Sequence, residues 1–224
     1  MDTQTVRNIG WDRDAMAARL ADDIPEGWCV NLGIGMPTRV ADFVPLSREV
    51  IFQSENGVIG MGPAPEPGHE DPWLINAGKQ RVTLRPGGAY VHHADSFGMI
   101  RGGHIDLCVL GGFQVAVNGD LANWARSDTD TAPAVGGAMD LGAGAKRLWV
   151  LMDHTDKQGR SKLVSRCTYP LTAVGTVGRV YNDLAVLDVA GDAFVVRAIA
   201  PGVSFDDLRA RTDAPLRDGR AIAA

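Results

Sequence analysis

The chain has 224 residues, of which 45% are hydrophobic and 22% are charged, and its net charge is −5. We expect a single α/β domain over residues 1–224, because this length is within the range of one large domain. The composition excludes a disordered chain, which would have far fewer hydrophobic residues. The acidic balance argues against nucleic acid as a partner, and no apolar stretch is long enough to span a membrane. The 27 glycines favour a ligand-binding enzyme, since glycine lets the backbone turn tightly or approach a ligand closely.

The three cysteines, Cys29, Cys108 and Cys167, are an odd number and lack the spacing of a zinc site or a disulfide framework. We therefore expect free thiols in a reducing cytoplasm, and the first residues do not have the pattern of a signal peptide. Cys29 and Cys108 stand in apolar runs, which predicts small buried side chains rather than reactive thiols.

Strand-like and helix-like patterns alternate along the first 150 residues or so, separated by glycine turns. The expected helices are residues 12–24, 39–44, 94–101 and 137–143. The expected strands are residues 28–32, 49–53, 81–84, 105–110 and 147–152. This order predicts a mostly parallel sheet with helices on both faces and with ligand sites at the carboxyl ends of the strands.

Two stretches depart from this alternation. Residues 57–78 contain five glycines and four prolines, which predicts a long loop of the kind that often covers a site. Residues 184–189 and 194–199 are joined by a short turn, which predicts an antiparallel hairpin. A final helix is expected over residues 205–211, with Ser204 as its N-cap.

One carboxylate, Glu55, stands at the abrupt end of an apolar strand in the sequence FQSENG, residues 52–57. Such a carboxylate either caps nearby backbone N–H groups in the turn or is presented for catalysis. A second glycine-rich turn, VGGAMD at residues 135–140, begins a predicted helix, and its backbone N–H groups can bind an oxyanion. The two turns together favour the catalytic interpretation.

Six motifs follow one another between Asn31 and Tyr169: FQSENG, GVIGMGP, INAGKQ, DSFGMIRGGHID, GDLANW and VGGAMDLGAGAK. In this order the chain resembles the B subunits of the 3-oxoacid coenzyme A transferases, over nearly its whole length. The resemblance implies the Rossmann-type fold that this family shares with sugar isomerases. Within the family, residues 92–97 and 103–106 look most like those of the enzymes that act on 3-oxoadipate.

The resemblance implies that Glu55 attacks the thioester carbonyl of succinyl-CoA and then carries CoA as a glutamyl thioester. It also implies that the Gly136 N–H stabilises the oxyanion. CoA is then a substrate, and no cofactor is expected. A partner A subunit supplies the rest of the site in this family, so we expect a hetero-oligomer of A and B subunits, A2B2 in stoichiometry.

Other residues near these motifs have alternative roles. Asn56 and Gly57 either fix the turn that presents Glu55 or touch substrate, and Asn31 contacts CoA, orients Glu55 or ties two loops together. Lys79 either neutralises a CoA phosphate or is simply solvated. The candidate residues for binding CoA or substrate are Asn31, Gly33, Gly35, Asn56, Gly57, Lys79 and Gly137.

His92, His93 and His104 do not have the spacing of a metal site, and we expect none. Arg101 is a candidate for a charge that is either structural or faces the distal carboxylate of a dicarboxylic substrate. Two other functions stay open: the same chemistry on acetoacetate or another 3-oxo acid, and a non-catalytic effector-binding domain of a related fold.

Overall fold

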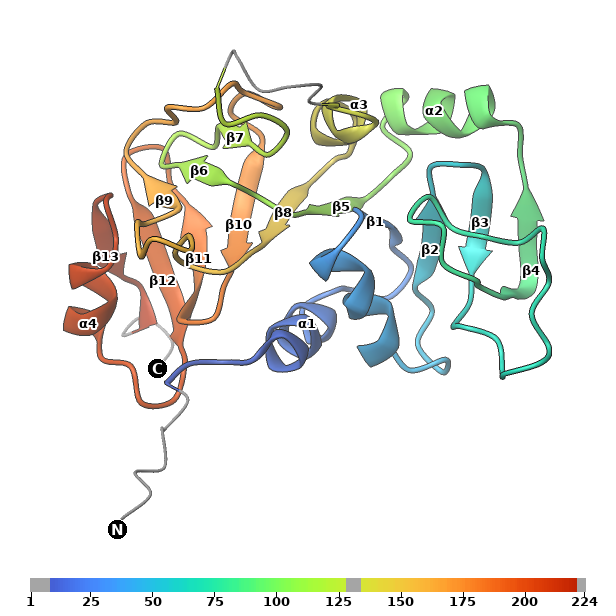
Figure 1. Cartoon of the computed structure of the whole chain (residues 1–224), viewed down its shortest axis with the longest axis horizontal. Helices are drawn as coiled ribbons and strands as arrows, with labels where there is room; N and C mark the ends of the chain where they lie inside the picture. Colours follow the sequence, from blue (N-terminus) through green and yellow to red (C-terminus); the bar gives the residue numbers. More distant parts are fainter. Residues whose placement is uncertain (1–8, 128–133, 221–224) are drawn as a thin grey trace, which may run out of the picture.

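The computed structural model describes residues 9–127 and 134–220. A ten-stranded sheet runs through the described chain and spans its whole width (Figure 1). From one edge to the other its strands are β13 (Leu216–Asp218), β12 (Phe194–Ile199), β11 (Ala185–Val189), β10 (Val177–Tyr181), β8 (Leu148–Leu151), β5 (Leu107–Leu110), β1 (Cys29–Leu32), β2 (Ile51–Ser54), β3 (Val58–Met61) and β4 (Leu84–Tyr90).

The centre of this sheet is parallel and its flanks are largely antiparallel. The strands β2, β1, β5, β8 and β10 pair in parallel, as do β12 and β13. The pairs β2–β3, β3–β4, β10–β11 and β11–β12 are antiparallel. The predicted mostly parallel α/β sheet and the predicted hairpin over residues 184–199 are both confirmed.

Helices cover both faces of the sheet. On one face α1 (Arg13–Asp22) and the 3-10 helix η1 (Met36–Phe43) pack with Leu107 and Val109 of β5. On the other face α2 (His93–Arg101) and α3 (Ala138–Gly144) pack with Cys108 and Leu110. Successive side chains of one strand thus enter opposite cores, as expected for a strand buried on both faces.

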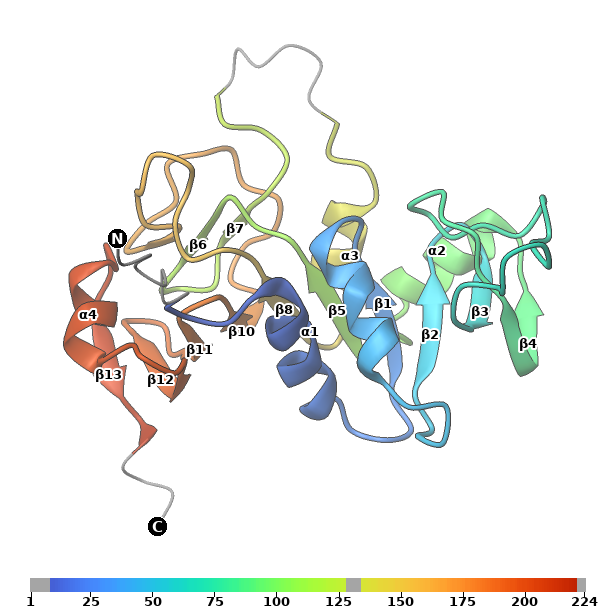
Figure 2. The same ribbon diagram turned by 60° about the horizontal axis from the view of Figure 1, so that its bottom comes forward.

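A second, three-stranded sheet packs on the same side as α2 and α3. Its order is β7 (Leu121–Ala122), β6 (Gln114–Ala116) and β9 (Leu163–Val164). Val115, Leu121 and Leu163 are fully buried and belong to the core that contains Val150 of β8. Figures 1 and 2 show β6 and β7 beside the strands β8 and β10.

Three predictions about elements were wrong in detail. The predicted loop over residues 57–78 begins with β3, which is paired on both sides in the hairpin that follows β2. The strand expected at residues 81–84 lies at Leu84–Tyr90, where Pro86 and Gly87 break the usual strand pattern. The helix expected at residues 39–44 is η1, a 3-10 helix that begins three residues earlier, at Met36. The strands β6, β7, β9, β10 and β13 were not predicted.

The C-terminal helix α4 (Phe205–Ala210) was predicted correctly, including its cap. The Ser204 hydroxyl accepts a hydrogen bond from the Asp207 backbone N–H at 3.0 Å, and the Asp207 carboxylate accepts one from the Ser204 N–H at 3.0 Å. This capping box satisfies two backbone donors that the helix itself leaves unpaired.

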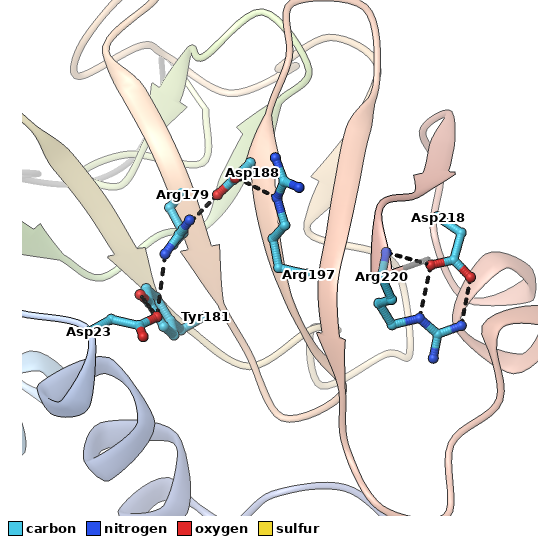
Figure 3. Close-up of polar contacts among 7 residues, drawn as sticks. All are labelled: Asp23, Arg179, Tyr181, Asp188, Arg197, Asp218 and Arg220. Carbon is cyan, nitrogen blue, oxygen red and sulfur yellow. Dashed lines mark hydrogen bonds and ion pairs between the residues drawn. The ribbon is translucent and has the colours of Figure 1, made fainter. Parts of the chain in front are cut away.

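A chain of polar contacts joins α1 to the antiparallel strands (Figure 3). Asp23, which follows α1, accepts a hydrogen bond from the Tyr181 hydroxyl at 2.7 Å and lies 3.3 Å from Arg179 Nη1. Asp188 on β11 binds the Nε atoms of Arg179 and Arg197 at 2.5 Å and 2.7 Å. At the sheet edge Asp218 pairs with Arg220. No helix in the described ranges is long and apolar enough to cross a membrane.

Candidate active site

Glu55 directly follows β2 and is the first residue of the tight turn to β3. The Gly57 N–H closes this turn by donating to the Ser54 carbonyl at 2.9 Å. Gly57 has φ +115, and a Cβ atom there would overlap the Val91 carbonyl oxygen. Only glycine fits this position, which supports the interpretation that Gly57 fixes the turn rather than binds substrate.

The loop that carries INAGKQ holds the same turn from outside. Asn56 donates from Nδ2 to the Ile75 carbonyl at 2.7 Å, and the Ala77 N–H donates to Ser54 Oγ at 2.9 Å. Lys79, at the end of this motif, is exposed. The contact of Asn56 is therefore structural, and the loop anchors the turn that carries Glu55.

The Glu55 carboxylate lies against the start of α3. A Cβ atom added to Gly137 would be 2.7 Å from Glu55 Oε2 and 3.0 Å from Oε1. The two glycine turns that the sequence singled out, around residues 55 and 137, therefore meet in space. The glycine at position 137 allows the Glu55 carboxylate to lie this close to the backbone, because any side chain there would displace the carboxylate.

A cavity of about 1220 Å³ opens at the carboxyl ends of the parallel strands β1, β2, β5 and β8. Glu55 lines it from the end of β2, and Gly33 from the end of β1. Gly136 and Gly137 line it from the start of α3. The structure thus brings four of the candidate residues together, at the strand ends where the alternating pattern placed the site.

Four other candidate residues do not line this cavity: Gly35, Asn56, Gly57 and Lys79. Asn31 also lies outside it, and only 2% of Asn31 is exposed. The amide of Asn31 donates to Gln53 Oε1 at 2.6 Å and to the Gln53 carbonyl at 3.2 Å. The structure therefore favours the structural alternative for Asn31, which ties β1 to β2 just before Glu55.

Sequence reasoning missed Gln53 and Ser96 as supports of the site. Gln53 Nε2 donates to Ser96 Oγ at 2.7 Å, and both side chains are buried. This bond continues the chain from Asn31 and fixes α2 to β2, two residues before Glu55. The sequence feature that could have indicated this contact is a glutamine in a predicted apolar strand, because the amide of a buried glutamine needs a hydrogen-bond partner.

Burial raises the pKa of the half-buried Glu55 carboxyl above its ordinary value. The nearby His93 on α2 works against this shift in the pKa of Glu55, and the negative charge of Asp140 on α3 adds to it. A carboxylate of raised pKa is a stronger nucleophile than a fully solvated one, because it holds its negative charge with less hydration.

The neighbouring thiols are poor alternatives as nucleophiles. Cys108 is completely buried, and its burial, with the nearby charge of Glu55, raises its pKa. Burial beside Asp106 raises the pKa of Cys29 to about 11. Thiols with such pKa values stay protonated near neutral pH, so Glu55 is the group equipped to attack.

The charged groups of α2 have structural contacts. Arg101 Nε lies 2.7 Å from Asp140 Oδ1 and thereby joins α2 to α3, and its guanidinium lies over the Phe97 ring. The structural alternative for Arg101 is therefore favoured. The His93 ring packs on the same Phe97, with ring centroids 4.8 Å apart. Within residues 9–127 and 134–220, no group of three His, Cys, Asp or Glu side chains could hold a metal ion.

The family model described as Coenzyme A transferase matches residues 13–211 of this chain. The chain belongs to the coenzyme A transferase family. Among its coenzyme A transferase relatives, the B subunit of the 3-oxoadipate CoA-transferase of Pseudomonas putida is 56% identical over 204 residues. These residues cover 91% of this chain and 95% of that protein. The B subunit of the Succinyl-CoA:3-ketoacid coenzyme A transferase of Helicobacter pylori is 46% identical, over 90% of this chain and 97% of that protein.

A solved structure of the coenzyme A transferase fold also resembles the chain. The Acyl-CoA transferase (YdiF) of Escherichia coli O157:H7 matches it with a TM-score of 0.73 at 20% identity. The match covers 94% of this chain but only 42% of the YdiF chain. At this level of identity the likeness concerns the fold.

Proposed function

We propose that this chain is the B subunit of a CoA transferase that moves CoA from succinyl-CoA to 3-oxoadipate through a thioester on Glu55. The observation that carries the proposal is the Glu55 carboxylate, which lines the cavity and lies against Gly137. The choice of 3-oxoadipate is supported by the 56% identical B subunit of Pseudomonas putida, whose name states that acid.

The reaction begins when a Glu55 carboxylate oxygen attacks the thioester carbonyl of succinyl-CoA. The C–S bond breaks, and a succinyl-glutamyl anhydride and the CoA thiolate are formed. The thiolate then attacks the Glu55 side-chain carbonyl of the anhydride, so that succinate leaves and CoA is held on Glu55. These exchanges are reversible because thioesters and anhydrides are both activated acyl groups, whereas a serine would leave a stable ester.

The acceptor acid repeats the two steps in the opposite order. A carboxylate oxygen of 3-oxoadipate attacks the glutamyl thioester and releases the CoA thiolate. The thiolate attacks the acceptor's carbonyl in the new anhydride, which yields 3-oxoadipyl-CoA and restores the Glu55 carboxylate. No proton has to be transferred in any step, so the site needs no general base.

Each attack creates a tetrahedral oxyanion, and the turn at the start of α3 is where a donor is available. Gly136 lines the cavity beside Gly137, which contacts Glu55. In the proposed mechanism the Gly136 N–H donates to the oxyanion, and one such donor contributes roughly 3 kcal/mol to lowering the barrier.

The proposed enzyme also contains an A subunit, and we propose that the two form an A2B2 hetero-oligomer in the cytoplasm. The relatives that are named as B subunits support a partner, and the three free cysteines support a reducing compartment. No cofactor takes part in the proposed reaction, since CoA is a substrate. A second candidate function is the same transfer to acetoacetate or another 3-oxo acid, which the name of the Helicobacter pylori relative supports.

The test is mass spectrometry of the complex with its A-type partner after incubation with succinyl-CoA. We expect the peptide that contains Glu55 to gain the mass of CoA less one water, and hydroxylamine to remove it. Glu55→Gln should abolish both the adduct and the transfer, whereas Glu49→Gln, on an exposed glutamate just before β2, should retain both. A folded wild-type complex that forms no adduct would instead support an effector-binding domain.

A further inference from the structure

The start of α2 lies directly against the turn that carries Glu55. The Val91 N–H donates to the Gly57 carbonyl at 2.9 Å. A Cβ atom on Gly57 would overlap the Val91 carbonyl oxygen and would be 4.0 Å from the carbonyl carbon of His92. His93 follows at once as the first residue of α2. Backbone contacts therefore fix the first turn of α2 beside Glu55.

The face of α2 that is turned toward the sheet includes His93. Ser96, three residues after His93, accepts a hydrogen bond from Gln53 Nε2 at 2.7 Å. Residues three apart on a helix share a face. His93 therefore lies nearer than Ser96, by one turn of the helix, to the end of β2 where Glu55 begins the turn.

The second helix, α3, closes the other side of Glu55. A Cβ atom on Gly137, at its start, would be 2.7 Å from Glu55 Oε2, and one on Gly144, at its end, would overlap the Ile100 carbonyl oxygen near the end of α2. The two helices thus run in the same general direction, and Figure 1 shows them beside each other. The Glu55 carboxylate lies at the level of the first turns of both.

The titratable groups that face Glu55 from the surrounding elements differ in their state. On α3, Asp140 is paired with Arg101 at 2.7 Å. On β5, Cys108 is completely buried, and burial raises the pKa of its thiol, so the thiol stays neutral. On α2, His93 opposes the rise in the pKa of Glu55 that burial causes. His93 is thus the group that can supply a positive charge to the nucleophile.

His93 is better placed to carry a proton than its neighbour His92. Nδ1 of His92 accepts a hydrogen bond from the Ala94 N–H at 3.2 Å as the cap of α2, and protonation at this nitrogen would break the cap. His93 is exposed, and its ring packs on Phe97. Asp95 is two positions further along and does not share the face of His93. An imidazole is largely protonated below about pH 6.

We propose that His93 is a positioning residue whose imidazolium stabilises the Glu55 carboxylate in the ionised form that attacks the thioester. This inference rests on the proposed function. The role applies to the loading of Glu55, which begins from the free carboxylate. It does not apply to the discharge by the acceptor acid, which begins from a neutral glutamyl thioester. The site can then half-bury its nucleophile and still keep it charged in mildly acidic solution.

The experiment measures the pH dependence of each half-reaction in the complex with its A-type partner. Loading from succinyl-CoA at low concentration is followed by rapid quench and mass spectrometry, and its rate constant reports groups of the free enzyme. For His93→Gln we expect the midpoint of the acid limb to rise by about half a pH unit, which makes loading near about pH 5 roughly threefold slower. Near about pH 8, where an imidazole is neutral, the rates should agree within about twofold.

Two further variants separate charge from packing and from net charge. His93→Lys keeps a positive charge and should restore the acid limb of the wild type, whereas it lacks the ring as His93→Gln does. His104→Gln is the matched control, because this exposed histidine lies beyond the far end of α2, about 12 Å from its start. Its acid limb should be that of the wild type. Discharge of the thioester by 3-oxoadipate should have the same pH profile in His93→Gln and the wild type.

Four results would overturn the inference. An unchanged acid limb in His93→Gln would show that His93 does not influence the ionisation of Glu55. A His93→Lys variant that behaves like His93→Gln would assign the effect to packing of the ring, and an equal shift in His104→Gln would reduce it to net charge. An equal shift in the discharge step would place the effect on a group other than Glu55. Failure of the proposed function is distinguishable, because the wild-type complex would then form no thioester at any pH.

Discussion

Glu55 and Asp188 are both half-buried acids on the same sheet, yet their environments are opposite. Asp188 receives Arg179 and Arg197, and these hydrogen bonds outweigh burial and lower the pKa of its carboxyl. Glu55 has no cation within ion-pair distance in the described part of the chain, and burial raises its pKa. The protein neutralises the acid that holds the antiparallel strands together and leaves the acid at the parallel strand ends free to react.

This difference follows from position in the sheet. Asp188 lies within β11, where Arg179 of β10 faces it in register and Arg197 of β12 is two residues beyond its register partner Val195. Glu55 lies just beyond the end of β2, where no cross-strand side chain is available and the cavity begins. Strand interiors supply partners and strand ends do not, which is one physical reason why reactive groups gather at the ends.

The largest expected effect is on catalysis, from Gly137→Ala. The new Cβ atom would lie 2.7 Å from Glu55 Oε2 and would push the carboxylate out of its position. We expect kcat/KM for CoA transfer to fall by roughly 100-fold, which is the cost of a misplacement of about 1 Å in an active site.

Gly98→Ala is the matched control, because no atom of the described chain outside the neighbouring backbone of α2 lies within 4 Å of the Cβ position of this helical glycine. Its transfer activity should be that of the wild type, and its thermal stability equal or slightly higher. Equal activity of Gly137→Ala and Gly98→Ala would contradict the close packing of Glu55 on α3.

The next effect is on stability, from Asp188→Asn. The amide cannot neutralise Arg179 and Arg197, which would keep their charges in a half-buried site. We expect the free energy of unfolding at neutral pH to fall by about 1–3 kcal/mol, measured by urea denaturation. Asp218→Asn breaks an exposed pair with Arg220 at the sheet edge (Figure 3) and should cost less.

Measuring stability as a function of pH tests the comparison between Asp188 and Glu55 further. The folded-state pKa of Asp188 is lowered, so its stabilising effect is complete above the unfolded value of about 3.9 and is lost as the pH falls through the folded value. The difference in Tm between the wild type and Asp188→Asn should therefore shrink below about pH 4. A difference that stays constant down to about pH 3 would show that packing, not charge, causes the loss.

The smallest expected effect has the opposite sign. The folded-state pKa of Glu55 is raised, so its ionisation penalises folding progressively as the pH rises above the unfolded value of about 4.3, and fully above the folded value. Glu55→Gln removes the charge and should raise Tm at neutral pH by roughly 1–3 °C, a small change because the carboxylate is partly solvated. The gain should vanish near about pH 4, and a loss of stability at neutral pH would contradict the raised pKa.

The central strands β1, β2, β5 and β8 and the four α-helices were predictable from sequence because their patterns are local. The strand that ends at Leu32 and the strand that ends at Leu110 are short apolar runs bounded by glycine. The edge strand β4 was placed too early because it contains Pro86 and two glycines, which edge strands tolerate and central strands do not. The strands β7 and β9 have two residues each and carry no periodic signal at all.

In the candidate site, too, local motifs were recognised from the sequence and long-range contacts were not. Glu55 and the glycine turn at residues 136–137 were found because each stands in a distinctive local motif. The bond from Gln53 to Ser96 joins residues 43 positions apart, and its partner could not be inferred from spacing.

The cavity is built from two separate parts of the chain, and this division has an evolutionary consequence. Glu55 is carried by the hairpin of β2 and β3, whereas Gln114 and Val164 line the cavity from the small sheet, whose strands follow β5 and β8 in the chain. Substitutions in the small sheet can change the shape of the cavity without moving the nucleophile. One catalytic hairpin can therefore be combined with different cavity walls in evolution, and protein engineers can exchange the small sheet between relatives without altering the hairpin.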